Sequence, residues 1–445
     1  MLSRVLPFAL ALAGLLLAVA PAAPAVPGAA SPSANAGYVD FSFFYSPSGG
    51  STNAVVSPTG EKPQSKLWYH DGRWWADLFS PAARAYHIFA LSWATQKWVD
   101  TGVAIDDRPQ TKADCLWDGA RLYVVSGGGA ISTGRDLDAR LYRYSYAGGR
   151  YRLDPGFPVV VRQGGAETIV IAKDSVGTLW VTYTQNNQVY LRRSSGSDLV
   201  WGAPFVVPAS GVNAGVAADD ISSIVAYGGR VGVLWSNQTD GSFYLASHVD
   251  GAASGKWSGQ VIARRTSLAD DHLNLKSLQS DPAGSLYAVV KTSLAGDQPS
   301  IVVLVGRPQS NGQLSWRSVT VTSATQSQTR PIVLIDTSNR AMYVFTATEG
   351  GGSIYLKSAS LDNLAFDPSA RGTPFISQAG APYLNDPTST KQNVSAASGL
   401  VVLASYDNGS HPAASSPATD VYAHNAIDLP APLQDRRVFV PLARR

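Results

Sequence analysis

The sequence predicts an all-β fold, a seven-bladed β-propeller with four-stranded antiparallel blades, in a chain of 445 residues. Tight-turn signals recur every 47 to 60 residues, each turn leads into an apolar strand, and one further strand is left over at the N-terminus. A period of this length is typical of a repeat architecture. The turn positions are Gly72, Gly119, Gly177, Gly229, Gly284, Asn339 and Gly399.

Each turn is followed by two strands rich in aromatic and β-branched residues, which suit sheets buried on both faces. The first strands are expected at 73–75, 122–125, 179–181, 233–235, 286–289, 342–345 and 400–403. The second strands are expected at 86–89, 141–144, 189–191, 243–245, 301–304, 354–356 and 421–423. Together with the strand before each turn, they predict seven related blades.

An aromatic residue is expected to open the next strand of six units: Trp98, Tyr151, Trp201, Trp257, Trp316 and Phe366. The seventh unit has no such residue, because the chain becomes proline-rich soon after Asn425. An apolar strand from Tyr38 to Tyr45 remains unassigned. We expect this N-terminal strand to complete the last blade and close the ring, which removes two exposed sheet edges.

Three regions are expected along the chain: a signal peptide with a Pro/Ala-rich segment at 1–36, one propeller domain at 37–429 and a C-terminal tail at 430–445. Arg4 precedes an apolar run from Val5 to Ala20, which is shorter than the roughly 20 residues of a membrane-spanning helix. A retained membrane anchor is the alternative. We expect a secreted protein, with the tail serving either as a surface-attachment tag or as a frayed basic end.

Composition excludes several function classes. The formal net charge is only +3 and the charges are scattered, so a nucleic-acid-binding stripe is missing. Cys115 is the only cysteine, so no intrachain disulfide can form. Motifs of serine hydrolases, nucleotide-binding loops and zinc proteases are absent from the sequence. We expect a monomer without a cofactor, with no membrane partner beyond surface attachment.

Polar residues precede or enter the innermost strand of every unit, which predicts a ligand site at the mouth of the central channel. Cations in this ring suit recognition of a carboxylate. The candidate ligand-binding residues are Lys66, Arg108, Lys112, Asn274, Lys276, Arg330, Lys391 and Gln392. The alternative is that these groups cap turns or pair with a neighbouring blade.

Carboxylates in the ring are the candidates for acid–base chemistry. Of the three glutamates, Glu61, Glu167 and Glu349, only Glu167 falls at a strand entry; its alternative role is an ion pair with Lys112 or Lys173. Three aspartate doublets, 106–107, 219–220 and 270–271, also precede innermost strands. Asp220 and Asp271 could supply an acid or base for glycoside hydrolysis. The doublets could equally hold Ca²⁺ or cap turns.

His272 is the one histidine in this ring and follows Asp271. It could remove a proton next to a uronate carboxylate while Arg330 and Lys391 neutralise that carboxylate, which is lyase chemistry. The alternative is a polar rim residue without a catalytic role.

Units three to five resemble the sialidase/BNR-like propeller superfamily, whose Asp-box has the pattern S-x-D-x-G-x-T-W after a strand. One such segment runs from 190–194 to Asp198 and Trp201, and another from 244–247 to Asp250 and Trp257. The residue before each tryptophan departs from the pattern. The resemblance implies a secreted carbohydrate-active propeller. For a sialidase, the resemblance would also imply an arginine triad, a Tyr/Glu nucleophile pair and an acidic Asp.

For that triad, Arg108 and Arg330 could supply two arginines, and no third is identified. Sialidases also have six blades, whereas seven repeats are counted here, which argues against cleavage of sialic acid. The expected function is therefore broader: a secreted glycoside hydrolase or polysaccharide lyase that acts on an extracellular, acidic glycan at the channel mouth. The alternative is a non-catalytic propeller for glycan binding, adhesion or protein interaction.

Overall fold

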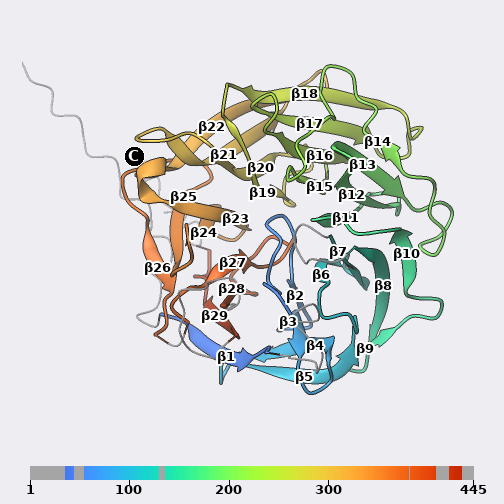
Figure 1. Ribbon diagram of the computed structural model, residues 1–445, viewed down its shortest axis with the longest axis vertical. Coiled ribbons are helices and arrows are strands. Elements are labelled where there is room, and N and C mark those ends of the chain that lie inside the picture. The colour runs from blue at the N-terminus through green and yellow to red at the C-terminus, as the bar shows by residue number, and fades with distance from the viewer. Residues whose placement is uncertain (1–35, 45–54, 130–135, 380, 407–419, 433–445) are drawn as a thin grey trace, which may run out of the picture.

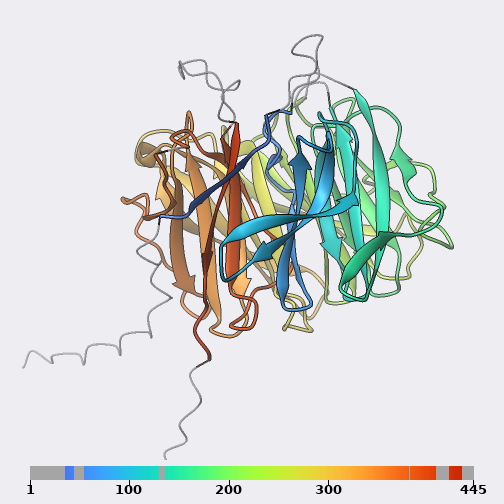
Figure 2. The same cartoon turned by 90° about the horizontal axis from the view of Figure 1, so that it is seen from below.

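The chain forms a closed ring of seven β-sheets around a central channel (Figures 1 and 2). The computed structural model describes residues 36–44, 55–129, 136–379, 381–406 and 420–432. The expected signal peptide and most of the expected tail lie outside the described residues. No helix in the described ranges is long and apolar enough to cross a membrane.

The blades follow one another along the chain, each running from the channel to the rim (Figure 1). Blade 1 contains β2 (Leu67–His70), β3 (Arg73–Ser80), β4 (Ala85–Ser92) and β5 (Lys97–Ala104). Blade 2 contains β6 (Lys112–Trp117), β7 (Arg121–Gly128), β8 (Leu137–Ala147) and β10 (Val159–Arg162), with β9 (Arg150–Leu153) pairing as an additional strand with β8. Blade 3 contains β11 (Ile169–Lys173), β12 (Leu179–Gln185), β13 (Gln188–Arg193) and β14 (Phe205–Val206).

The second half of the ring repeats the same order. Blade 4 contains β15 (Ser222–Tyr227), β16 (Arg230–Asn237), β17 (Ser242–Val249) and β18 (Trp257–Arg264). Blade 5 contains β19 (Ala269–Ser277), β20 (Leu286–Thr292), β21 (Pro299–Pro308) and β22 (Leu314–Ser323). The short 3-10 helix η2 (Ala324–Gln326) leads to blade 6, with β23 (Gln328–Asp336), β24 (Ala341–Thr348), β25 (Ile354–Ser360) and β26 (Thr373–Ile376). Blade 7 contains β27 (Asn385–Thr388), β28 (Leu400–Tyr406), β29 (Val421–Ile427) and β1 (Tyr38–Ser42).

The turn between β2 and β3 shows why the repeated turn signals mark the blades. His70 pairs with Arg73, so Asp71 and Gly72 form a two-residue hairpin loop with φ values of 52° and 67°. Such a loop needs positive φ at both positions, which Asp tolerates and Gly adopts freely. The strands beside the turns are buried on both faces, and every residue of β28 is buried.

The N-terminal strand closes the ring as predicted. In β1, Tyr38 pairs with His424 and Val39 with Ala423 of β29. The Tyr38 ring stacks on the imidazole of His424 with centroids 5.2 Å apart. His424 Nδ1 lies 2.8 Å from Oδ2 of Asp40, and the histidine side chain is fully buried. Blade 7 therefore joins both ends of the described chain.

The prediction that an aromatic residue opens the strand after the hairpin is correct in four blades. Trp98, Trp257 and Trp316 lie within β5, β18 and β22. Tyr151 lies in the additional strand β9, where its ring packs 5.1 Å from that of Trp75 in blade 1. The remaining two, Trp201 and Phe366, precede β14 and β26 without lying in them. These two aromatic side chains pack between elements, and such packing does not require the residue to lie in a strand.

Three consecutive blades carry an irregularity at the start of the innermost strand. The register shifts between Ala269 and Leu273 in β19, between Thr329 and Ile332 in β23, and between Asn385 and Thr388 in β27. A β-bulge redirects side chains and is common next to active sites. In blades 5, 6 and 7 the bulges therefore change the direction of side chains at the start of the innermost strand.

Among the described residues, the loop before β2 and the segment 389–394 both contact the innermost strands of several blades. The loop before β2 reaches the centre of the ring in Figure 1, and its residues 58–66 are all buried. Gln64 Nε2 of this loop donates to the Ile169 carbonyl in blade 3 at 3.0 Å. At the other end of the channel, the segment 389–394 contacts several blades; for example, Lys276 Nζ donates to the Thr390 carbonyl at 2.7 Å. We call residues 58–66 the channel loop.

Candidate functional site at the channel mouth

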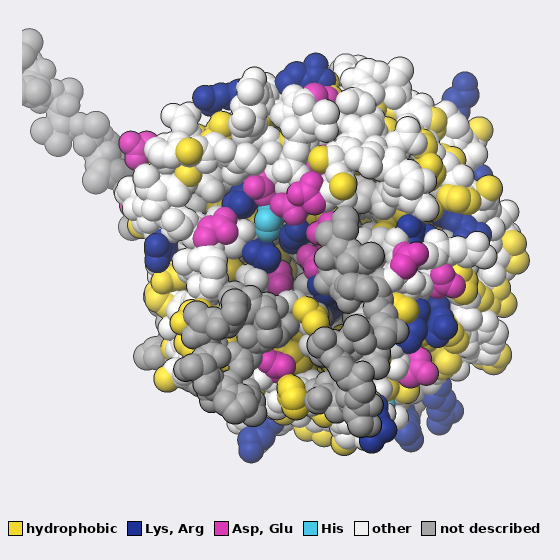
Figure 3. Space-filling view, viewed as in Figure 1, with side chains coloured by type: hydrophobic (Ala, Val, Ile, Leu, Met, Phe, Trp, Pro, Cys, Tyr) yellow, Lys and Arg dark blue, Asp and Glu magenta, His cyan; other side chains and the backbone are white. Residues whose placement is uncertain are grey.

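Charged side chains of both signs and a histidine gather at the centre of the face seen in Figure 3. This face carries the starting ends of innermost strands, and we call it the mouth. The group includes residues of the channel loop and of blades 2, 3, 5 and 6. We refer to these residues as the mouth cluster: Glu61, Lys62, Lys112, Glu167, Asp270, Asp271, His272, Lys291 and Arg330.

Lys62 is the centre of the cluster. Its ammonium contacts Asp271 Oδ2 and lies 3.3 Å from Glu167 Oε1 and 4.0 Å from Glu61 Oε2. The Lys62 side chain is only 6% exposed. Burial disfavours its charge, but the three carboxyl groups outweigh burial and raise the pKa of Lys62 above its ordinary value. One lysine therefore holds together residues of the channel loop, blade 3 and blade 5.

Glu61 also belongs to the mouth, although the sequence analysis placed it outside the ring. One carboxylate oxygen contacts Lys112 Nζ at the start of β6. Burial favours the neutral acid, but the charges of Lys112, Lys62 and Arg330 prevail and lower the pKa of Glu61 to about 2. Glu61 is therefore an ionised group that balances the surrounding cations.

Glu167 differs from Glu61 in its protonation. Burial raises the pKa of Glu167 to about 7; Lys62 opposes this shift, and the carboxylates of Glu61 and Asp271 add to it. Its side chain is 8% exposed. Oε2 is buried and has no hydrogen-bond partner among the described residues. Glu167 can thus carry a proton near neutral pH on an oxygen that no protein group occupies.

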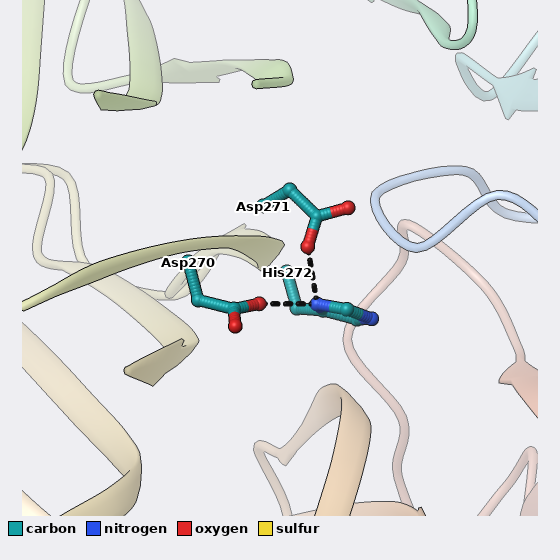
Figure 4. Close-up of side chains that lie close together, drawn as sticks. All are labelled: Asp270, Asp271 and His272. Carbon is teal, nitrogen blue, oxygen red and sulfur yellow. Dashed lines mark hydrogen bonds and ion pairs between the residues drawn. The ribbon is translucent and has the colours of Figure 1, made fainter. Parts of the chain in front are cut away.

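His272 lies between two carboxylates, as Figure 4 shows. Its Nδ1 contacts Asp270 Oδ1 and lies 2.7 Å from Asp271 Oδ1. Nε2 lies 3.3 Å from the Thr329 hydroxyl. Burial disfavours the charge of Asp271, but His272 and Lys62 outweigh it and hold its pKa well below the ordinary range. Asp271 is therefore the ionised counterpart of Glu167.

The same three residues have donor atoms within 4.8 Å of one another, a spacing that could hold a metal ion. However, Lys62 already contacts Asp271, and Lys291 Nζ lies 3.0 Å from Asp270 Oδ2. Ca²⁺ requires six to eight oxygen ligands. A set of three donors whose charges are balanced by two ammonium groups does not fit Ca²⁺.

Arg330 forms an ion pair across the boundary between blades 6 and 7. Its Nε lies 2.7 Å from Asp386 Oδ1, and both residues have φ of 49°. Positive φ is uncommon for residues with a side chain, and such strain concentrates at functional sites. The two bulges thus direct this pair toward the mouth, where Arg330 also acts on the charges of Glu61 and Asp271.

Four predicted binding residues lie deeper in the channel than the mouth cluster. Lys66 donates to Gln64 Oε1 at 3.0 Å, and burial lowers its pKa to about 8. Burial and the nearby Lys391 lower the pKa of Lys276 to about 7. Lys391 pairs with Asp114 at 2.8 Å, and Gln392 bonds the backbone of Tyr69 through both side-chain atoms. These contacts separate the four residues from Arg330, although Lys391 and Arg330 were expected to neutralise the same carboxylate.

The remaining candidates form structural contacts, within a blade or linker for Arg108 and Asp220 and between blades 5 and 6 for Asn274. Arg108 makes two hydrogen bonds to the Asp106 carboxylate, at 2.8 and 2.7 Å. Asp220 accepts from the amides of Ala217 and Gln238 and from the Ser236 hydroxyl. Asn274 Oδ1 accepts from the Val333 amide at 3.3 Å. All three have the structural role that the sequence analysis gave as the alternative.

The alternative partners expected for Glu167 are wrong. Lys112 contacts Glu61, and Lys173 pairs with Asp118 at 2.6 Å. The actual partner is Lys62, which the sequence analysis did not consider. A usable signal existed, because Glu61 and Lys62 stand one residue before Gln64, Ser65 and Lys66 in the segment that leads into the first innermost strand.

A cavity of about 400 Å³ opens beside Glu167 on the mouth side, between blades 2, 3 and 4. Besides Glu167, its wall includes Asp136 and Arg162 and the amides of Gln185, Asn186 and Asn187. A second cavity of about 420 Å³ adjoins Lys391, Leu275 and Trp117 at the opposite end of the channel. The first cavity is the one continuous with the mouth cluster through Glu167.

No protein-family model matches the chain, and no curated protein matches its sequence. Distant structural similarity exists to several β-propellers. Polysaccharide lyase Uly1 has a TM-score of 0.48 at 9% identity, covering 89% of this chain and 98% of the lyase. The periplasmic gluconolactonase PpgL of Pseudomonas aeruginosa has a TM-score of 0.46 at 14% identity, covering 79% and 94%. The NanB sialidase of Streptococcus pneumoniae has a TM-score of 0.35 at 10% identity, covering 66% of this chain and 49% of the sialidase.

The fold and the site together define a seven-bladed β-propeller with a buried cluster of carboxyl groups, lysines and one histidine at its channel mouth.

Proposed function

We propose that the protein is a secreted carbohydrate-active propeller, and that it hydrolyses a glycosidic bond at the channel mouth. The observation that carries this proposal is the contrast between two carboxyl groups held by one lysine. Glu167 has a pKa raised to about 7, whereas Asp271 stays ionised. Neighbouring carboxyl groups with separated pKa values are the usual acid and base of glycoside hydrolysis.

In this mechanism Glu167 donates its proton to the oxygen of the leaving sugar. The ionised carboxylate of Asp271 attacks the anomeric carbon as the bond to the leaving sugar breaks, which forms a covalent glycosyl-enzyme. Burial opposes its charge, but its contacts with His272 and Lys62 outweigh burial, lower its pKa and keep it ionised at acidic pH. Water then completes hydrolysis, with Glu167 acting as the base in the second step. The cavity beside Glu167 would receive part of the glycan.

The test is to incubate purified residues 37–445 with acidic and neutral polysaccharides and to identify the products by mass spectrometry. Saturated reducing ends are expected. Glu167→Gln should reduce turnover at least about a hundredfold, because general acid catalysis contributes that much or more. Glu349→Gln is the matched control, because this glutamate is 48% exposed and lies at the same mouth, paired with Lys291.

A polysaccharide lyase is the second candidate. Two carboxylates contact Nδ1 of His272, which leaves Nε2 as the nitrogen that could accept a proton. Unsaturated uronate ends among the products would favour this reaction over hydrolysis. The absence of any product, combined with retention on one immobilised polysaccharide, would instead favour a non-catalytic binding or adhesion module.

A further inference from the structure

We propose that the cavity beside Glu167 binds an anionic substituent of the ligand, a carboxylate or a sulfate, through the guanidinium of Arg162. This inference rests on the proposed function, because it assigns a charge to the glycan that the mouth would take.

Arg162 ends β10 and is buried, with 5% of its surface exposed. Its guanidinium lies over the ring of Tyr183, with Cζ 5.0 Å from the ring centroid, and Nη1 contacts the Gly164 carbonyl. These contacts fix the direction of the group without neutralising its charge. Nε is buried and has no hydrogen-bond partner among the described residues.

The other cations near the mouth are already paired with carboxylates. Lys62, Lys112, Lys291 and Arg330 each lie within 4.0 Å of a carboxylate oxygen, and Arg162 has no such contact within the described ranges. Burial lowers the pKa of Arg162 and outweighs the charges of the nearest acids, Asp136 and Asp138, which act on it from beyond ion-pair distance. Asp136 also accepts from the Gly165 amide, and Asp138 accepts from the Gly164 amide at 2.7 Å.

A buried guanidinium without a carboxylate is costly unless a partner of opposite charge arrives. Carboxylate and sulfate match the planar fork of arginine. Gln185, Asn186 and Asn187 line the same cavity, and residues of these types offer donors and acceptors for hydroxyl groups. A cavity of about 400 Å³ is in the range of ligand sites. The combination suits an acidic or sulfated sugar.

The test is calorimetric titration of the intact domain with three probes: sodium glucuronate, glucose as its neutral match, and sodium sulfate. Glucuronate is expected to bind at least about tenfold more tightly than glucose, because a charge-assisted pair is lost with the neutral sugar. Sulfate binding without glucuronate binding would assign the site to sulfated glycans. Equal binding of glucuronate and glucose, or binding of none of the three probes, would overturn the proposal.

Variants separate ligand binding from folding. Arg162→Gln should weaken binding of the anionic probe at least about tenfold, and Arg162→Lys, which keeps the charge without the fork, should weaken it less. Arg152→Gln, at an exposed arginine of blade 2, is the control and should leave binding unchanged. Arg162→Gln should not lower the melting temperature, because it removes an unpaired buried charge. Wild-type affinity in Arg162→Gln, or loss of folding in both Arg162 variants, would show that the arginine is structural.

Failure of this inference is distinguishable from failure of hydrolysis. Asp271→Asn, at a residue outside the cavity wall, should abolish turnover while probe binding to Arg162 stays within about twofold. Binding that depends on Arg162 in a protein without turnover would retain the subsite and reject the hydrolase.

Discussion

The ammonium of Lys62 lies 3.3 Å from Oε1 of Glu167, while Oε2 of the same carboxyl group is buried without a partner among the described residues. One oxygen is therefore held by the protein, and the other has no partner among the described residues. The same ammonium contacts Asp271. The protonation of both acids thus depends on a lysine from the channel loop.

Replacing Lys62 by methionine should destabilise the domain by about 3–5 kcal/mol, because three buried or nearly buried carboxyl groups would lose their shared cation. Urea unfolding at pH 7 measures the change. Lys97→Met, at an exposed lysine of blade 1, should change stability by less than about 0.5 kcal/mol. Equal stabilities of the two variants would mean that the cluster does not need Lys62.

The turnover rate should fall as pH rises through about 7, because Glu167 must be protonated to act as the acid and its pKa is raised to about 7. Asp271 stays ionised far below that pH, so no acidic limb is expected from it. The pH profile of kcat/KM measures this. A rate that instead rises through the same range would favour a base, as the lyase mechanism requires.

Glu167 should also make the folded state less stable at alkaline pH. Its folded-state pKa of about 7 lies above the ordinary value of 4.5, so its favourable contribution is complete below pH 4.5 and is lost as pH rises to about 7. The loss is at most about 3 kcal/mol. Glu167→Gln should remove this part of the pH dependence in denaturant titrations. Parallel stability curves for the two proteins would contradict the raised pKa.

Hydrolysis should retain the anomeric configuration. One ammonium contacts both Glu167 and Asp271, so the two groups are closer than the roughly 6.5–9.5 Å of inverting enzymes. Proton NMR of the first sugar released distinguishes the two outcomes before mutarotation. An inverted product would mean that Asp271 does not attack the anomeric carbon.

The closing strand should depend on His424. This fully buried imidazole bonds Asp40 of β1 at 2.8 Å and Gln96 of blade 1 at 3.1 Å. His424→Ala should cost about 2–4 kcal/mol by thermal or urea unfolding. His87→Ala is the matched comparison, because its partner Asp100 lies within the same blade and is one-third exposed. It should cost less, and a similar cost would show that closure adds nothing.

Local sequence patterns predicted the ring of blades, because a turn such as Asp71-Gly72 requires positive φ at both positions and only a few residue types adopt it readily. They did not predict the position of Lys391 correctly. A residue a few positions before the turn at Gly399 was expected to enter the innermost strand, but β27 already ends at Thr388. Lys62 was missed because its partners in blades 3 and 5 are more than a hundred residues away. Contacts made by an irregular loop leave no periodic signal.

The pairing of β1 with β29 also sets the order in which the molecule can be completed. Asp40 and His424 are separated by 384 positions, so the first strand must wait for almost all of the remaining chain to be synthesised. Until then β1 has no partner, and the earlier blades form an open arc whose first and last sheets each expose one face. Assembly therefore finishes with a single late step, and a chain interrupted before β29 would leave β1 unpaired and both faces exposed.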